Sequence, residues 1–509
     1  MKLQDSMTMF FIPFYMENCD MDNLLPSRTI WERSKLKIEK NAIYPHIHDF
    51  LVGNVNINSE DSLNPQNCTI YSLKDSWKDV TPEDKCISKI ISSFRFEINV
   101  GKRDNKKTLT FSFLNEKSNL LSPKLILYPQ AQIGLLMLGI ELTVENKTVY
   151  DLVTLNYHIH KIDKGQSPII QASIKRDDEI SKEKATEINN IYSALNRYAT
   201  FEKPKRDKDA EGWYLSSFIR FLLSDFEKYQ RPVVMFNEER AHLFTYLSVD
   251  TEISNDELIE DYVRIIRCQN ENYQMMQEEL DYGRFYTQTF ENIYIGTSVE
   301  GTAMMTLAPD FAPDFIKNFK TGSLVPRYLW IYLLVYIQRH TLIELTKELM
   351  GVDMKTIDDS KRNLGRIITK LSIMKIKSYF TNISDHTQHN LFYRFCANNL
   401  SIEQHFGEIR EKVNDLSIIL QEKELQQTQE AKENDEQRDR KLGKLLAFMT
   451  IAQVFFAFVA FSRANVSFDW TLSLYAGNWK LFIDSLIAVI AAGSIVFSLY
   501  IAYIVIKKK

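Results

Sequence analysis

Many sequence features that identify enzymes are missing from this chain of 509 residues. It has 16 glycines, but no two of them are separated by a single residue, and no Gly-x4-Gly-Lys-Ser/Thr phosphate loop occurs. The Gly-x-Ser-x-Gly and His-Glu-x-x-His spacings of hydrolases and metalloproteases are also missing. The sequence therefore predicts neither an enzyme nor a cofactor, and a bound nucleotide would have to be held by aromatic residues and scattered Lys and Arg.

Cysteine is scarce, and the charge is nearly balanced. The five cysteines are far apart, without a pair at metal-ligand spacing, and their number is odd (Cys19, Cys68, Cys86, Cys268 and Cys396). We expect reduced thiols in the cytosol. The formal net charge is −4. Proteins that bind nucleic acid directly normally carry a basic excess, so the balance argues against that function.

Histidine pairs and one basic cluster are the remaining candidates for ligand binding. Each pair would offer two imidazoles on one face of an extended or helical segment, but none has an identifiable third ligand nearby. We interpret them as ordinary core or surface histidines and the basic cluster, which is interleaved with Asp207 and Asp209, as a solvated linker. The residues concerned are His46, His48 and Asp49; His158 and His160; Asp385, His386 and His389; and Lys203, Lys205, Arg206 and Lys208.

Long apolar runs occur only near the C-terminus, at Leu445–Ser462 and Leu481–Ile506. A hydrocarbon core of roughly 30 Å is crossed by about 20 apolar residues in a helix, and both runs suffice without an internal Pro. Trp470 and Trp479 lie in the connecting residues 463–480, where an interfacial aromatic belt is expected. The sequence therefore predicts two transmembrane helices joined by an outer loop.

The distribution of Lys and Arg predicts the orientation of this hairpin. Four basic residues precede the first span and residues 507–509 are all Lys, whereas only Arg463 and Lys480 lie between the spans. Because basic residues accumulate on the cytoplasmic side, both ends of the chain are expected there, with the hairpin in the inner (cell) membrane. The N-terminal apolar stretch is too short for a signal peptide. About 440 residues are thus expected in the cytosol.

The first 165 residues read as sheet-rich. Ile91–Leu114 alternates apolar and polar residues around a polar turn, which predicts a hairpin, and Lys124–Pro129 and Ile133–Leu142 predict further strands. A boundary near residue 165 would begin a mixed α/β to helical region, residues 166–400. There, Trp213–Phe226 is helix-like and Arg240–Val249 is strand-like.

The end of this second region is predicted to be mostly helical. Ser254 and Glu257 form a capping box that opens one long helix reaching Gly283. Asn292–Leu307 predicts a hairpin around Glu300-Gly301. Pro326 is expected to open an apolar helix that ends at Gly351. Its uncharged stretch is shorter than the roughly 18 residues a span needs, so it is predicted to be a buried helix rather than a third span.

Residues 401–444 predict a stalk helix. Its apolar residues follow a 4-3-4-3-4 spacing, as in a coiled coil, and no Pro interrupts the polar stretch that leads to the membrane. At 1.5 Å per residue the stalk would be about 65 Å long. We do not expect a single chain to bury this seam, so the pattern implies oligomerisation. The seam residues are Ile402, Phe406, Ile409, Val413, Leu416 and Leu420.

The same rhythm continues into the first span as a stripe of small or polar residues, with Phe448, Phe455 and Phe458 lying off it. One interpretation is close packing of helices through small residues. The other is a bundle of several copies whose Thr450 and Gln453 line water, which the cost of burying the Gln453 amide in lipid favours. The pore-lining candidates are Leu446, Met449, Thr450, Gln453, Ala457, Ala460 and Asn465, with Arg463 and Asp469 at the outer mouth.

This layout of a large cytosolic α/β domain, long helix, first span, short outer loop, second span and basic tail resembles that of CorA-type magnesium transporters. The resemblance implies five copies around an axial pore, with a ligand sensed through the stalk. Ser462-Arg463-Ala464-Asn465-Val466 stands where that family has Gly-Met-Asn, so only Asn465 could survive from the motif. Arg463 would repel divalent cations if it faced the axis, which puts magnesium transport in doubt.

CorA-like proteins that lack Gly-Met-Asn and carry an enlarged cytosolic domain resemble the membrane effectors of type III CRISPR systems. That resemblance implies a channel opened by a nucleotide second messenger, such as the conjugate of S-adenosylmethionine and AMP, through widening of a constriction near Leu446 and Met449. Two alternatives stay open: a transporter of divalent cations such as magnesium or cobalt, and a membrane-anchored scaffold without a pore.

Overall fold

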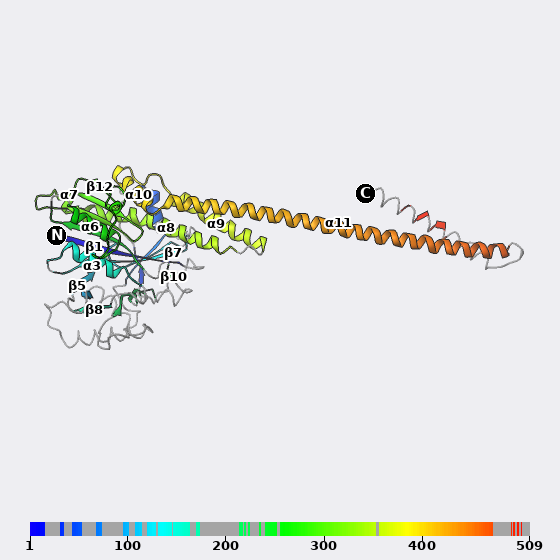
Figure 1. Cartoon of the computed structure of the whole chain (residues 1–509), viewed down its shortest axis with the longest axis horizontal. Helices are drawn as coiled ribbons and strands as arrows, with labels where there is room; N and C mark the ends of the chain where they lie inside the picture. Colours follow the sequence, from blue (N-terminus) through cyan, green and yellow to red (C-terminus); the bar gives the residue numbers. More distant parts are fainter. Residues whose placement is uncertain are drawn as a thin grey trace. The chain divides into compact units, whose positions relative to one another are not determined.

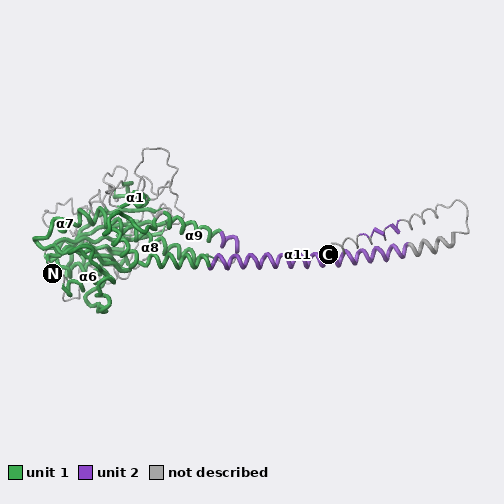
Figure 2. The backbone as a smooth tube through the Cα atoms, turned by 90° about the horizontal axis from the view of Figure 1, so that it is seen from above, with its two compact units in different colours: residues 1–353, 362–414 green, residues 354–361, 415–509 purple. Residues whose placement is uncertain are grey.

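The computed structural model describes two compact units of the chain (Figure 2). The first consists of residues 1–353 with 362–414, and the second of residues 354–361 with 415–509. The residues described are 1–15, 31–34, 43–52, 68–73, 95–100, 107–114, 120–128, 131–144, 146–162, 169–173, 240–251, 255–352 and 356–471, together with short pieces within 213–223, 234–235 and 490–500.

The first unit is built on a sheet of 14 strands. β1 (Leu3–Tyr15) lies at its centre, antiparallel to β7 (Ile133–Leu142) on one side and to β11 (His242–Val249) on the other. From edge to edge the main path runs β12 (Tyr286–Phe290), β13 (Ile293–Thr297), β14 (Gly301–Leu307), β11, β1, β7, β5 (Lys107–Phe113), β4 (Arg95–Val100), β8 (Ile169–Ser173) and β9 (Trp213–Tyr214). Off this path lie β2 (Trp31–Arg33), β3 (Thr69–Leu73), β6 (Lys124–Tyr128) and β10 (Val234–Met235).

Helices cover both faces of this sheet, and the alternation of β1 shows how (Figure 1). Phe10 and Phe14 point into the large core that also holds apolar residues of α3 (Val149–Ile159) and α6 (Asp256–Ile266). Phe11 points to the opposite face, as alternate strand residues must, and its ring lies 5.6 Å from that of Tyr332 in α8 (Leu329–Met350). A central strand buried on both faces explains why β1 is apolar from Met9 to Tyr15.

Most sequence predictions for the strands are confirmed. β4 and β5 form the predicted hairpin within residues 91–114, β7 has the predicted bounds, and β13 with β14 forms the hairpin before residue 307. The helical prediction is wrong at Trp213 and Tyr214, which pair with β8. Strands on both sides of residue 165 belong to one sheet, because β11 and β14 pair next to β1.

The predicted long helix after Ser254 is much shorter than expected. α6 begins after Asn255, whose side chain accepts a hydrogen bond of 2.8 Å from the Leu258 N–H, so the cap is one residue later than Ser254. The helix ends at Ile266, and Cys268 adopts a positive φ of 49°. Residues 269 to 272 are all polar, so a longer helix would have no apolar stripe to bury there. The helix propensity of these residues alone is not enough to extend α6.

The apolar helix α8 confirms the prediction of a buried helix. Almost every residue from Leu329 to Leu345 is buried, and the helix ends at Gly351 as expected. Its beginning differs from the prediction, because a π-helical segment, η3 (Lys320–Tyr328), leads directly into it and contains Pro326. Pro326 therefore lies within a continuous helical segment instead of opening one.

The central strand β7 allows a direct test of the packing. A Cβ added at Gly139 would lie 2.3 Å from the main-chain oxygen of Leu121, so backbone has to move. We expect Gly139→Ala to lower the free energy of unfolding by about 2 kcal/mol, measured by urea denaturation in detergent. Gly365→Ala is the control. Gly365 lies in a helix, and no atom outside its own helical backbone lies within 4 Å of an added Cβ there. Equal stabilities of the two variants would contradict the described packing.

Candidate functional site

The most distinctive element is α11 (Ile402–Thr471), one helix of 70 residues (Figure 1). Its length corresponds to about 105 Å at 1.5 Å per residue. The prediction that the stalk runs unbroken into the first apolar run is confirmed. The helix continues nine residues past Ser462 and includes 463–471 of the expected outer loop, which therefore begins as helix. The second span and the basic tail lie almost wholly outside the described residues.

The apolar part of α11 is long enough to cross a membrane, and it is exposed in the single chain. Phe448 is 72% exposed, and Ile451, Phe455, Phe456 and Phe458 are exposed to a similar extent. The core helix α8 differs, because it is buried within the first unit and charged residues interrupt its apolar sequence. A surface of this kind is stable in lipid or against other apolar helices, which supports membrane association.

The pore candidates separate into two groups on this helix. Leu446, Thr450, Gln453, Ala457 and Ala460 fall within roughly 40° of one line along α11, at about 100° per residue. The Thr450 hydroxyl donates to the Leu446 main-chain oxygen at 2.8 Å, so it is satisfied within its own helix. Met449 lies beside this line and is exposed.

The candidates beyond the expected end of the span do not continue the line. Because the helix is unbroken to Thr471, the backbone positions of Arg463, Asn465 and Asp469 are turned by roughly 100° or more from it. The outer mouth was predicted on the assumption of a loop, and a continuous helix places these three positions on other sides. Their roles, like those of the stripe, stay predictions.

The seam that implied oligomerisation is buried by the chain itself. α9 (Ile357–Lys377) runs beside the first turns of α11 in both views (Figures 1 and 2). The Phe406 ring stacks on Tyr379 with 5.5 Å between centroids, and the Lys375 Nζ lies 5.9 Å from the same ring. Ile402, Ile409, Val413 and Leu420 are all buried. The argument that this seam needs a second copy is therefore wrong.

The second unit contains a further contact between the same two helices. Lys361, in the first turn of α9, makes an ion pair of 2.6 Å with Glu424 of α11. Both side chains are substantially exposed, so this pair contributes little to stability. Together with the contact between Lys375 and Phe406, this ion pair shows that α9 runs antiparallel to α11.

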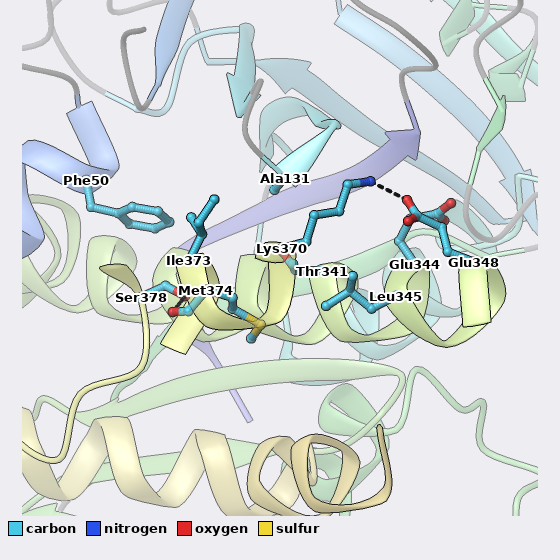
Figure 3. Close-up of a pocket in the computed structure, with 10 residues that line it drawn as sticks. All are labelled: Phe50, Ala131, Thr341, Glu344, Leu345, Glu348, Lys370, Ile373, Met374 and Ser378. Atoms are coloured by element: carbon cyan, nitrogen blue, oxygen red, sulfur yellow. Dashed lines mark hydrogen bonds and ion pairs between the residues drawn. The ribbon is translucent and has the colours of Figure 1, made fainter. Parts of the chain in front are cut away.

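A pocket lies where α8 and α9 meet α1 (Pro45–Val52) and the turn before β7 (Figure 3). It encloses about 460 Å³ that opens to solvent, but only about 30 Å³ admits the centre of a water-sized sphere. In this conformation it therefore has room for about two water molecules. The pocket is lined by Phe50, Ala131, Thr341, Glu344, Leu345, Glu348, Lys370, Ile373, Met374 and Ser378.

The polar side chains of this pocket join the sheet to both helices. The Lys370 ammonium donates to Glu348 Oε1 and, at 2.5 Å, to Gln132 Oε1. The Tyr15 hydroxyl, at the end of β1, donates to the same Gln132 oxygen at 3.1 Å. The Arg366 guanidinium lies 4.0 Å from Glu348 Oε2. No motif marks this pocket in the sequence; its only signal is the i, i+4 spacing of Glu344 and Glu348 in an apolar helix.

Two of the histidine pairs involve helices. His46 and His48 lie in α1 and His158 lies in α3, so the extended geometry considered for them is wrong. Burial lowers the pKa of His160 to about 4, and the ring is neutral at pH 7. Among the described residues, no group of three or more His, Cys, Asp or Glu is placed to hold a metal. The basic cluster at 203–208 lies outside the described residues.

Comparison of the chain with models of known protein families, with curated proteins and with solved structures finds no match.

Proposed function

We propose that this protein is a ligand-gated membrane channel of the CorA type, with the sheet-containing unit in the cytosol and the apolar part of α11 as the wall of the pore. The observation that carries the proposal is the continuity of α11 from Ile402 to Thr471. Its first turns contact α9 through Phe406 and Lys375 within the first unit, and its exposed apolar residues lie between 445 and 459. A single helix without Pro transmits a displacement along its axis, because a sharp kink would break the main-chain hydrogen bonds of the turn where it forms.

The composition of the apolar segment supports a pore more than a plain anchor. A simple anchor is best served by apolar residues on every side, whereas here Thr450, Gln453 and Ala457 follow one line and the Phe residues lie off it. A Gln amide in hydrocarbon costs several kcal/mol unless it faces water or a polar partner. Several copies with this line turned inward would place a ring of Gln453 around water.

The proposed activator is a nucleotide second messenger, such as the conjugate of S-adenosylmethionine and AMP, and the proposed role is antiviral defence in a type III CRISPR system. The support is the resemblance in layout together with Ser462-Arg463-Ala464-Asn465-Val466 in place of Gly-Met-Asn. The proposed assembly is a homopentamer in the inner membrane with both chain ends in the cytoplasm. Its subunit contacts are formed by faces of α11 other than the seam that α9 covers.

Substitution of Gln453 tests the pore directly. We expect Gln453→Leu to lower the conductance of the full chain in planar bilayers at least tenfold when the conjugate is added, because a ring of leucines excludes water from the axis. Phe455→Leu, two positions along on the exposed aromatic side, is the matched control and should conduct as the unaltered chain does. Cross-linking before reconstitution shows that both variants assemble equally. Unchanged conductance in Gln453→Leu would favour the scaffold without a pore.

A further inference from the structure

The charge of α11 changes sign just before its apolar segment begins. Residues 421–437 contain six acidic residues and two lysines, whereas residues 438–444 contain four basic residues and one acidic residue. No charged residue then follows until Arg463. A short basic segment therefore directly precedes the part of the helix that is long and apolar enough to cross a membrane. The four basic residues, all exposed, are Arg438, Arg440, Lys441 and Lys444.

Two of these basic residues line up with apolar residues of the span. At about 100° per residue, Lys441, Lys444, Phe448, Ile451 and Phe455 fall within roughly 40° of one line along α11. All five side chains are exposed. We call these five residues the basic-apolar stripe. Its ammonium groups lie at one end and its apolar side chains continue from them without interruption.

The basic-apolar stripe lies on the side of α11 opposite the line that holds Thr450 and Gln453. These two positions are turned by roughly 140° or more from the middle of the stripe. The nearby acidic positions Asp435 and Asp439 are turned by roughly 160° from it, on the side of Thr450 and Gln453. Positive charge and exposed apolar surface therefore share one side of the helix, and these carboxylates lie on the other.

The spacing along the stripe matches the layers of a bilayer. Lys444 directly precedes Leu445, and Lys441 lies about 6 Å before Leu445 along the helix axis, at 1.5 Å per residue. The headgroup layer on each side of the hydrocarbon core is about 5 to 8 Å thick. With Leu445 at the edge of the core, both ammonium groups lie among lipid phosphates, and the apolar side chains of the stripe lie beside acyl chains.

We propose that the basic-apolar stripe binds a phospholipid with an anionic headgroup, such as phosphatidylglycerol. Lys441 and Lys444 donate hydrogen bonds to its phosphate oxygens, and an acyl chain lies along the apolar side chains. A soluble acidic partner is disfavoured, because it would leave Phe448 and Phe455 exposed. A second copy of α11 in the same direction is disfavoured, because its lysines would face these lysines. The site depends on insertion of α11 into a membrane, and not on a pore.

Spin-labelled lipids test the site on the full chain reconstituted in phosphatidylcholine bilayers. Electron paramagnetic resonance measures how much of each labelled lipid the protein immobilises. We expect phosphatidylglycerol to associate about fivefold more strongly than phosphatidylcholine at low salt, and this preference to fall below about twofold at roughly 1 M salt. The absence of a preference, or one that salt leaves unchanged, would overturn the proposal. Release of the labelled lipid by inorganic phosphate at millimolar concentration would assign the site to free phosphate instead.

A double substitution tests the two lysines. Lys441→Gln together with Lys444→Gln should lower the preference for phosphatidylglycerol below about twofold at low salt. Lys412→Gln together with Lys432→Gln is the matched control, because it removes the same charge from exposed positions of α11. The nearer of these, Lys432, is about 20 Å from Leu445 along the axis, beyond the reach of screened charges. Equal preferences in the two double variants would overturn the proposal.

Moving one charge around the helix distinguishes the stripe from a general basic excess. Lys444→Gln together with Gly443→Lys keeps the charge, but turns the ammonium by about 100°. No atom outside its own helical backbone lies within 4 Å of a Cβ added at Gly443. This variant should lose as much of the preference as Lys444→Gln alone. An undiminished preference would show that any nearby charge suffices and would overturn the site. None of these measurements depends on conductance, so failure of the proposed channel would leave their outcome unchanged.

Discussion

Ile409→Asp is expected to destabilise the single chain by about 4 kcal/mol, because it replaces a core side chain by a carboxylate that has no partner. Ile409 is 1% exposed and belongs to the seam of α11. The loss should appear as a lower midpoint in urea denaturation, and it should be the same at all protein concentrations. A seam contact between copies would instead make the size of this loss depend on protein concentration.

The matched control lies on the same helix. Ile418 is 54% exposed, nine residues further along α11, so Ile418→Asp should change the stability by less than about 0.5 kcal/mol. If the two variants were equally stable but only Ile409→Asp dissociated an oligomer, the seam would join different chains, and the described pairing of α9 with α11 would be wrong.

Ala431→Pro is expected to interrupt the transmission of motion along α11. Ala431 lies in the exposed middle of α11, where a Pro removes one hydrogen bond and clashes with the preceding turn, at a cost of about 3 kcal/mol. Spin labels at residues 421 and 441 should give one narrow distance of about 30 Å in the unaltered helix, from 20 residues at 1.5 Å. In Ala431→Pro the distance should shorten and its distribution broaden.

The functional consequence follows from the same kink. Conductance on addition of the conjugate should fall at least tenfold in Ala431→Pro, while insertion into the membrane stays unchanged. Ala431→Ser keeps the helix and should behave as the unaltered chain does. A kinked helix that conducts normally would show that α11 does not carry the signal.

The parts of the fold that were predictable share one physical property, a pattern that is local in the sequence. The apolar run Ile133–Leu142 and the polar sequence between β4 and β5 locate strands within a few residues. The short uncharged stretch of α8 correctly indicated a buried helix. The absence of Pro correctly predicted that the stalk and the apolar run form one helix.

The wrong predictions concern segments whose local pattern is compatible with more than one packing partner or more than one structure. The 4-3-4 spacing from Ile402 to Leu420 identifies a surface that must be buried, but spacing does not say which helix buries it. Here α9 of the same chain does, and nothing in the pattern of α9 marks it as the partner. Similarly, Tyr273, Met276 and Leu280 hold helical spacing, yet the polar residues before them end the helix at Ile266.

The pocket could not be found from the sequence, for a related reason. Phe50, Ala131, Glu344 and Lys370 come from four separate elements, and only the fold brings them together. The stripe through Thr450 and Gln453 was visible, but the unbroken helix to Thr471 moves Asn465 off it. Spacing in the sequence placed Thr450 and Gln453 on one face of α11. It did not place Asn465, because the sequence did not show that the helix continues past Ser462.

The central claim is that a ligand bound outside the membrane opens a pore formed by α11. The most direct measurement is the current through planar bilayers containing the purified full chain, before and after the conjugate of S-adenosylmethionine and AMP is added to the side that carries the large unit. The account predicts a low current that rises on addition and falls again on washout. A current that is the same with and without the conjugate, from protein shown to be inserted and assembled, would contradict it.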